Sequence, residues 1–258
     1  AHRRPAEVLQ KMISIKPEGF QQQLAVLTEL EQRQIPYATA TALTRTAQGL
    51  MDRLRDEMRV VFDRPTPYTQ NSLRMVPARK DRLEARVWFK DEADGAQPAS
   101  VWIAPEVYGG PRRNKPAELQ LRAKGILPEG KYVVPGAGAD LDRYGNIRRG
   151  QVTKALSGIR GFTQAGYNAN ATDSRRSRAK GNARRYFVMT RKGQPIGIAE
   201  RTGRGRDAVS IIMAFVSRPS YRRRLSFFEI AQQYADENLP REFEVAMRGV
   251  AARFAARR

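Results

Sequence analysis

Two acidic pairs have the spacing that metal-assisted chemistry on phosphate would use. Asp140 and Asp142 lie two residues apart in a turn-rich segment, and Asp236 and Glu237 are adjacent at the end of an expected helix. Paired carboxylates hold Mg²⁺ in nucleases. Solvated charge is the usual explanation for acidic pairs in turns and at helix ends. We therefore expect a protein that is not an enzyme and has no catalytic residue, metal or cofactor.

The residue types that most enzymes use are almost absent. The sequence contains no cysteine and a single histidine, His2. Thiol nucleophiles, disulfides, cysteine-based zinc sites and Ser–His relays are therefore excluded. Gly136 and Gly138 suggest a nucleotide-binding turn, but the third glycine and the strand–helix frame of that motif are missing. We reject that function for this segment.

Positive charge is the strongest feature of the composition. The 258 residues include 47 Lys and Arg against 26 Asp and Glu, which gives a formal net charge of +21. Residues 151–206 hold 13 basic and two acidic residues, about half of the excess. Hydrophobic residues make up 41% of the chain, enough to bury a core in one large domain or two small ones.

The basic residues concentrate between residues 173 and 185. Small and polar residues separate the cations without apolar periodicity, which predicts a mobile loop rather than a helix face. Two interpretations stay open: the loop contacts a polyanion such as nucleic acid by neutralising phosphates, or it is a solvated loop or one that pairs with acidic groups of a neighbouring subunit. The candidate contact residues, including two from a second basic turn at 202–206, are Arg175, Arg176, Arg178, Lys180, Arg184, Arg185, Arg204 and Arg206.

Apolar spacing predicts the elements that carry these residues. Helical spacing indicates helices over 6–15, 20–33, from Pro36 to Val61, 116–124, 151–160, and from Phe227 through Leu239-Pro240 to the last residues. Alternation indicates strands over 73–76 and 83–90, and 100–104 is a third candidate. A hairpin of 186–190 and 196–200 around Arg191-Lys192-Gly193-Gln194-Pro195 and a buried apolar strand over 209–216 are also expected. The tryptophans, Trp88 and Trp102, are expected to anchor the core from within strands.

These elements predict an α+β fold, a small antiparallel sheet packed with N-terminal and C-terminal helices, plus an extended Gly/Pro-rich insertion. We expect three parts: residues 1–104 with the first helices and strands, an arm at 105–150 ordered mainly by a partner, and residues 151–258 with the basic loop and terminal helix. The longest apolar stretch, 209–216, is too short to span a bilayer. A protein that stays in the cytoplasm, or is packaged there, is expected.

Two stretches resemble the minor tail protein Z and tail-completion (neck) proteins of tailed bacteriophages. The first runs from Gln34-Ile35-Pro36-Tyr37 through the small residues that follow to Leu43-Thr44-Arg45-Thr46-Ala47. The second runs from Ser210-Ile211-Ile212-Met213-Ala214-Phe215-Val216 through Leu239-Pro240-Arg241-Glu242-Phe243 to the C-terminal helix. The order of helix, strands, basic loop, apolar strand and terminal helix also agrees, whereas the segment 105–150 departs from the compact members of that family.

The resemblance implies a structural virion protein at the head–tail neck or proximal tail. Such proteins form homo-oligomeric rings around the DNA channel, and six or twelve copies are natural guesses. The implied partners are further copies of itself, portal, adaptor or tail-tube proteins, and genomic DNA, with no membrane involved. The implied locations are the virion and, during assembly, the host cytoplasm. The alternatives are a capsid-associated minor or cement protein and a general nucleic-acid-binding protein.

Overall fold

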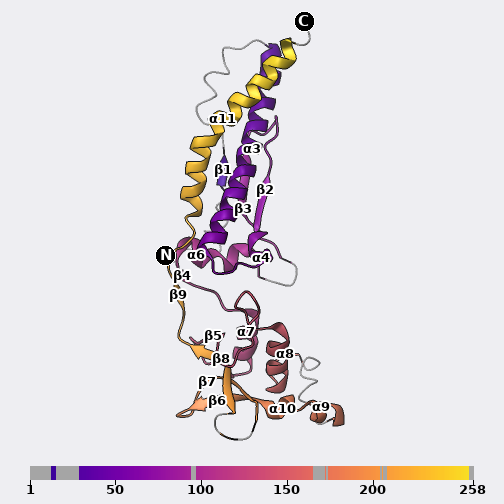
Figure 1. Ribbon diagram of the computed structural model, residues 1–258, viewed down its shortest axis with the longest axis vertical. Coiled ribbons are helices and arrows are strands. Elements are labelled where there is room, and N and C mark those ends of the chain that lie inside the picture. The colour runs from indigo at the N-terminus through magenta and orange to yellow at the C-terminus, as the bar shows by residue number, and fades with distance from the viewer. Residues whose placement is uncertain are drawn as a thin grey trace. The chain divides into compact units, whose positions relative to one another are not determined.

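The computed structural model describes residues 13–15, 29–93, 97–164, 172, 174–203, 205 and 208–255. The chain divides into two units (Figure 1). The discontinuous unit combines residues 1–110 with residues 222–258, and the inserted unit consists of residues 111–221. Both units contain helices and antiparallel strands, so the expected α+β class is confirmed.

The discontinuous unit packs two long helices on a small sheet. Its helices are α3 (Glu29–Val61), α4 (Pro67–Gln70), α5 (Ala99–Trp102), α6 (Ala104–Tyr108) and α11 (Phe227–Ala255). Its strands are β1 (Ile13–Ile15), β2 (Leu73–Val76) and β3 (Ala85–Phe89), which pair antiparallel in the order β1-β3-β2. Figure 1 shows α11 running alongside α3, although their sequences are more than 160 residues apart.

The apolar residues whose helical spacing predicted the helix ending at Val61 form a stripe at the centre of this unit. Its fully buried members are Leu43, Ala47, Leu50, Leu54 and Met58. The stripe packs against alternate residues of β3 and the start of α11, which supply Ala85, Val87, Phe89, Phe227 and Ala231. The rings of Phe89 and Phe227 lie 4.9 Å apart. Burial of this stripe is the main force that brings the two separate parts of the unit together.

The two long helices approach closely at Gly49. A methyl group on Gly49 would lie 2.1 Å from Tyr234 Oη on α11 and 3.0 Å from Tyr234 Cζ. A side chain at position 49 would have to displace the Tyr234 ring, which accounts for glycine in the interior of α3 despite its low helix propensity. Gly249, also within a helix, has no atom near the position that a methyl group would take.

Three predicted elements of this unit are wrong. The break expected at Pro36 does not occur, because burial of Ile35, Ala38 and Ala42 beside it outweighs the single helical hydrogen bond that proline removes. The helix expected over 6–15 contains instead the strand β1, which pairs with the edge of β3. The rest of that segment, and residues 20–28 of the second expected helix, lie outside the described residues.

The third error is the strand expected over 100–104, where the chain forms α5 and then α6. Two prolines explain the difference. Pro98 occupies the N-cap of α5, and Pro105 lies in the first turn of α6, where the missing N–H has no helical partner to lose. Trp102 still packs against the core, but from a helix. The strand prediction at 73–76 is confirmed, as is the strand within 83–90.

The inserted unit is a four-stranded sheet with helices. Its strands are β5 (Tyr132–Pro135), β6 (Tyr186–Arg191), β7 (Gln194–Arg201) and β8 (Val209–Val216), all antiparallel in the order β5-β8-β7-β6. Its helices are α7 (Pro116–Ala123), α8 (Arg149–Gly158), α9 (Arg175–Lys180) and α10 (Asn182–Arg185). Where the chain passes between units, the short strands β4 (Gly110–Pro111) and β9 (Ser220–Tyr221) pair with each other. The hairpin predicted around Lys192 and Gly193 is confirmed.

The arm expected at 105–150 is folded, and the expected division at residues 104 and 150 is replaced by one at 110 and 221. Leu121, Leu127 and Tyr132 from this segment are buried in the core of the inserted unit with residues of α8 and the sheet. Glycines with positive φ, such as Gly125 at 67°, form the turns between its short elements. A few large apolar residues thus secure a segment whose Gly/Pro content suggested an extended chain.

Gly136 and Gly138 are explained by the sheet. The N–H groups of both glycines donate to carbonyl groups of β8, those of Ile212 and Ile211, at 3.0 and 2.9 Å. A methyl group on Gly136 would lie 2.1 Å from the Ile211 carbonyl oxygen. Glycine is required here so that the chain after β5 can lie against the backbone of β8.

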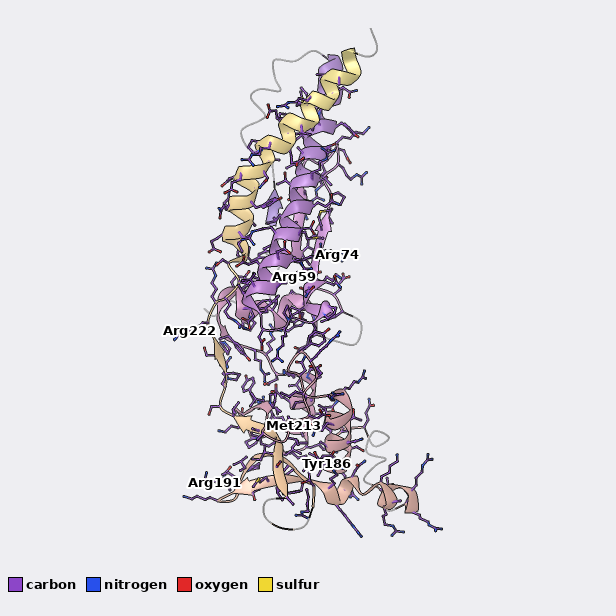
Figure 2. All side chains as sticks on the ribbon, viewed as in Figure 1. Arg59, Arg74, Tyr186, Arg191, Met213 and Arg222 are labelled. Carbon is purple, nitrogen blue, oxygen red and sulfur yellow. The ribbon has the colours of Figure 1, made fainter. Side chains whose placement is uncertain are left out.

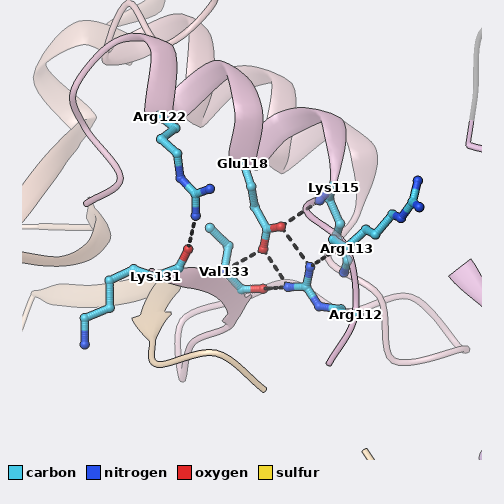
Figure 3. A network of polar contacts seen from close by, with 7 residues as sticks. All are labelled: Arg112, Arg113, Lys115, Glu118, Arg122, Lys131 and Val133. Atoms are coloured by element: carbon cyan, nitrogen blue, oxygen red, sulfur yellow. Dashed lines mark hydrogen bonds and ion pairs between the residues drawn. The ribbon is translucent and has the colours of Figure 1, made fainter. Parts of the chain in front are cut away.

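A buried carboxylate joins α7 to β5 (Figure 3). Glu118 is 1% exposed and accepts two hydrogen bonds from Arg112, at 2.8 and 2.5 Å. It also accepts one from the Lys115 N–H and one from the Val133 N–H, each at 2.7 Å. Arg112 in turn donates to the Val133 carbonyl at 3.1 Å and lies 4.9 Å from the ring centre of Tyr132.

This network keeps Glu118 ionised. Burial opposes the charge, but the hydrogen bonds from Arg112 and from the two backbone N–H groups outweigh it, so the pKa of Glu118 lies below its usual value. The same ion pair raises the pKa of Arg112. Both members are therefore charged at neutral pH and hold the start of the inserted unit to its sheet.

We expect Gly49→Ala to lower the free energy of unfolding of the discontinuous unit by about 1–3 kcal/mol, because the methyl group overpacks against Tyr234. Gly249→Ala is the matched control and should stabilise α11 by up to about 1 kcal/mol. Both tryptophans lie in the discontinuous unit, so their fluorescence during urea unfolding reports on it alone. Equal effects of the two substitutions would contradict the close approach at Gly49.

We expect Glu118→Gln to destabilise the inserted unit by about 3–5 kcal/mol, because it leaves Arg112, whose side chain is only 12% exposed, without its counter-charge. The lowered pKa of Glu118 means that its stabilisation is present above about pH 4.3 and is lost as the pH falls further. Hydrogen exchange of amides in 116–135 measures both effects. Glu129→Gln, at an exposed carboxylate, is the control and should change neither. Persistence of the wild-type acid sensitivity in the Glu118 variant would argue against the assignment.

Candidate nucleic-acid interface

The described residues of the basic segment, 174–185, form not a loop but two short helices, α9 and α10. Ser174 caps α9 by accepting a hydrogen bond from the Ser177 N–H at 3.2 Å. Gly181 ends the helix in the left-handed conformation, with φ of 68°, and α10 begins immediately after it. The prediction of a loop is wrong because it relied on the missing apolar periodicity. The cap residues at both ends, and the good helix propensity of Arg, Ala and Lys, were the signals that indicated a helix.

The charge of the protein follows its division into units. The inserted unit contains 23 Lys and Arg but only seven Asp and Glu, whereas the discontinuous unit contains 24 and 19. In the discontinuous unit, arginines of α3 such as Arg53, Arg55 and Arg59 form ion pairs with acidic residues one turn away. The inserted unit has too few acidic residues to do the same.

Helices α9 and α10 present cations that no described acidic group neutralises. Arg175, Arg176, Arg178 and Arg184 are exposed, and none of them forms an ion pair with any residue that the structure describes. Lys180 is exposed on the same helix. Figure 2 shows the side chains of α9 and α10 extending from the ribbon. Extended, unpaired guanidinium groups are suited to bidentate contact with phosphate.

Arg185 differs from the other cations of this segment. Its guanidinium lies 2.5 Å from Glu200 Oε1, and Glu200 is only 6% exposed on β7. Tyr186 Oη donates to the same oxygen at 3.3 Å, and Gln151 Nε2 donates to Glu200 Oε2 at 3.1 Å. Burial, with the neighbouring charge of Glu200, raises the pKa of Tyr186. Arg185 therefore fixes α10 to the sheet, and the sequence did not separate this role from that of its neighbours.

The second basic turn contributes less to the described surface. Arg204 and Arg206 lie outside the described residues. Arg201, which precedes them at the end of β7, lies over the ring of Phe187 with 5.1 Å between the guanidinium carbon and the ring centre. Two residues that the sequence did not single out belong to the same region. Ser177 lies within α9, and Arg160 lies just after α8. Both line a cavity of about 480 Å³ between the end of α8, the helices α9 and α10, and β6.

The acidic pairs considered for metal binding have local partners. Asp140 forms an ion pair with Arg148 at 3.0 Å, and the N–H of Asn146 and of Tyr144 bind Asp142. The Asn146 hydrogen bond is the main cause that lowers the pKa of Asp142. In α11, side-chain amides one turn earlier, those of Gln232 and Gln233, donate to Asp236 and Glu237. Among the described residues, no three His, Asp or Glu side chains gather as metal ligands would.

Comparison with known proteins gives no family assignment. No protein-family model, curated protein or solved structure matches the chain. No helix in the described part of the chain combines the length and the apolar character needed to cross a bilayer. The basic interface itself is therefore the main guide to function.

We expect the neighbouring substitutions Arg184→Gln and Arg185→Gln, which remove the same charge, to differ in stability. Arg185→Gln leaves the buried Glu200 without its cation and should destabilise the inserted unit by about 1–3 kcal/mol. Arg184→Gln, at an exposed position without an ion-pair partner among the described residues, should change stability little. Hydrogen exchange of the β6 and β7 amides measures the difference. The same protection in both variants would show that the Arg185–Glu200 pair does not fix α10.

Proposed function

We propose that this chain is a structural virion protein of a tailed bacteriophage, a tail-completion or neck protein that contacts the genome through α9 and α10. The observation that carries the proposal is the group of exposed arginines on these helices, Arg175, Arg176, Arg178 and Arg184, which form no ion pair with the described residues. A resemblance of two sequence stretches to tail-completion proteins supports the virion part of the proposal.

The arginines of α9 and α10 suit binding to the phosphate backbone of a nucleic acid, whatever its base sequence. Guanidinium groups on two short helices neutralise phosphates and release their counterions, which gives salt-dependent affinity without base recognition. The glutamate-bound Arg185 anchors the surface, so that the cations project from a fixed support rather than from a flexible chain. The role is one of holding DNA, and no catalytic step is assigned to the protein.

A ring of copies would strengthen a weak contact. In a cyclic homo-oligomer each subunit repeats the α9–α10 surface around the axis, and several modest contacts act together on one DNA molecule. We propose such a ring, of six or twelve copies, at the head–tail junction or proximal tail of the virion. Its other partners are portal, adaptor or tail-tube proteins.

Electron cryo-microscopy of the virion tests this assignment. A ring in the neck or proximal tail whose density fits α3, α11 and the inserted sheet is the expected result. Absence of the protein from purified particles would overturn the virion role. If the protein were absent from particles but the isolated protein bound DNA with steep salt dependence, it would be better described as a general nucleic-acid-binding protein. The exposed arginines support that function too.

Neutralising the exposed cations should weaken DNA binding without unfolding the protein. The variant changes Arg175, Arg176, Arg178, Lys180 and Arg184 to Gln and keeps Arg185. We expect the slope of log K against log salt concentration to become less steep by about 0.9 for each phosphate that the variant no longer neutralises. Fluorescence anisotropy with labelled duplex DNA at several salt concentrations measures the slope.

A control variant removes the same charge elsewhere. It changes five ion-paired arginines of the discontinuous unit, Arg53, Arg55, Arg59, Arg74 and Arg248, to Gln. This variant should keep most of the salt dependence if α9 and α10 make the contact. Equal loss of salt dependence in both variants would show that net charge, and not this surface, determines DNA binding.

A further inference from the structure

The cavity beside α9 and α10 combines cationic, hydroxyl and apolar groups. Its cations are Arg160, Arg178 and Arg184, and its apolar lining comes chiefly from Ile159, Phe187 and Val188. The volume of about 480 Å³ lies in the range of small-molecule sites. These lining residues come from three places that the fold brings together: the chain just after α8, the helices α9 and α10, and β6.

Ser177 is the residue that marks the cavity as a binding site. Its side chain is 5% exposed and lines the cavity, yet its hydroxyl oxygen has no hydrogen-bond partner among the residues that the structure describes. Buried hydroxyl groups are almost always paired, because leaving one unpaired costs free energy. An acceptor that enters the cavity would restore the missing hydrogen bond of Ser177.

Beside the cavity, the end of α8 packs closely against the start of α10. A methyl group on Gly158, at the end of α8, would lie 2.7 Å from the Asn182 carbonyl oxygen at the start of α10. Glycine at this position lets α8 approach α10 and sets the wall of the cavity. The close contact between α8 and α10 thus forms one side of the cavity, which Arg178 and Arg184 also line.

We propose that this cavity binds one nucleotide unit. The phosphate contacts Arg178 and Arg184 and accepts a hydrogen bond from the Ser177 hydroxyl, and the sugar and base lie against Ile159, Phe187 and Val188. The inference rests on the proposed DNA contact of α9 and α10 and extends it, because a pocket that holds one nucleotide recognises a strand end or an unstacked nucleotide rather than a continuous duplex. A free nucleotide offers the same chemistry.

Calorimetric titration of the full chain with thymidine 5′-monophosphate tests the proposal. We expect saturable binding, with thymidine and inorganic phosphate each binding at least tenfold more weakly, because each satisfies only one part of the cavity. Ser177→Ala should weaken nucleotide binding about tenfold or more, the effect of losing a hydrogen bond to a charged group. Its thermal midpoint should stay the same or rise, since the unpaired hydroxyl is removed.

A second variant and a control test whether the nucleotide binds in the cavity. Ala183→Phe fills the cavity from an exposed position and should abolish nucleotide binding. Arg175→Gln/Arg176→Gln removes two cations that do not line the cavity, and should weaken duplex binding while leaving nucleotide affinity unchanged. A hexathymidylate with a 5′-phosphate, compared with the same strand without it, distinguishes a strand end from a free nucleotide as the source.

The proposal is overturned if thymidine monophosphate shows no saturable binding at millimolar concentration, if inorganic phosphate binds equally well, or if Ser177→Ala and Ala183→Phe both bind as the wild type does. Failure of the proposed function has a different signature. In that case the protein is absent from virions or binds duplex DNA independently of α9 and α10, whatever the nucleotide titration shows.

Discussion

A buried carboxylate in a strongly basic unit is the constraint on which the inserted unit depends. Glu118 receives four hydrogen bonds from Arg112 and two backbone N–H groups, and through them α7, β5 and the chain entering the unit are held together. Removing water from a single carboxylate is costly unless every lone pair finds a donor. Here all the donors come from within 15 residues of Glu118, so the network is local in the sequence and closes the segment from Arg112 to Val133 on itself.

The same scarcity of acidic residues explains the surface of the unit. Two of its seven carboxylates, Glu118 and Glu200, are buried, and each binds an arginine that supports the fold. The acidic residues that remain are too few for the other cations. Four arginines on α9 and α10 consequently have no ion-pair partner in the described part of the chain, and an external polyanion is the counter-charge that such a surface attracts. The discontinuous unit, with nearly balanced charge, pairs many of its arginines along its own helices.

The sequence was most informative where one periodicity dominated. The helical spacing of Leu43 through Leu54 predicted the buried face of α3, and alternation predicted β2 and β3, because both patterns follow directly from backbone geometry. Composition was a poor guide elsewhere. Residues 105–150 are rich in glycine and proline, yet Leu121 and Leu127 are buried in the core of the inserted unit and secure the segment, and only the tertiary contacts show this. The density of basic residues predicted where the candidate site lies, but not what each residue does. The sequence does not distinguish Arg185 from Arg184, because only the folded sheet places Glu200 beside Arg185. Ser177 is identified only by its buried, unpaired hydroxyl in the folded chain.

The insertion of one unit into the other fixes the order in which the protein can fold during synthesis. Residues 111–221 are synthesised before α11 and leave the ribosome ahead of it, so the inserted sheet and its buried ion pairs can begin to form first. The apolar stripe of α3 has no α11 to cover it during that time. The pairing of β4 with β9 then brings the ends of the inserted unit together, which shortens the effective loop that separates α3 from α11. A newly made chain therefore carries an uncovered hydrophobic helix until α11 emerges, and that interval is when chaperones, or neighbouring nascent copies, would meet it.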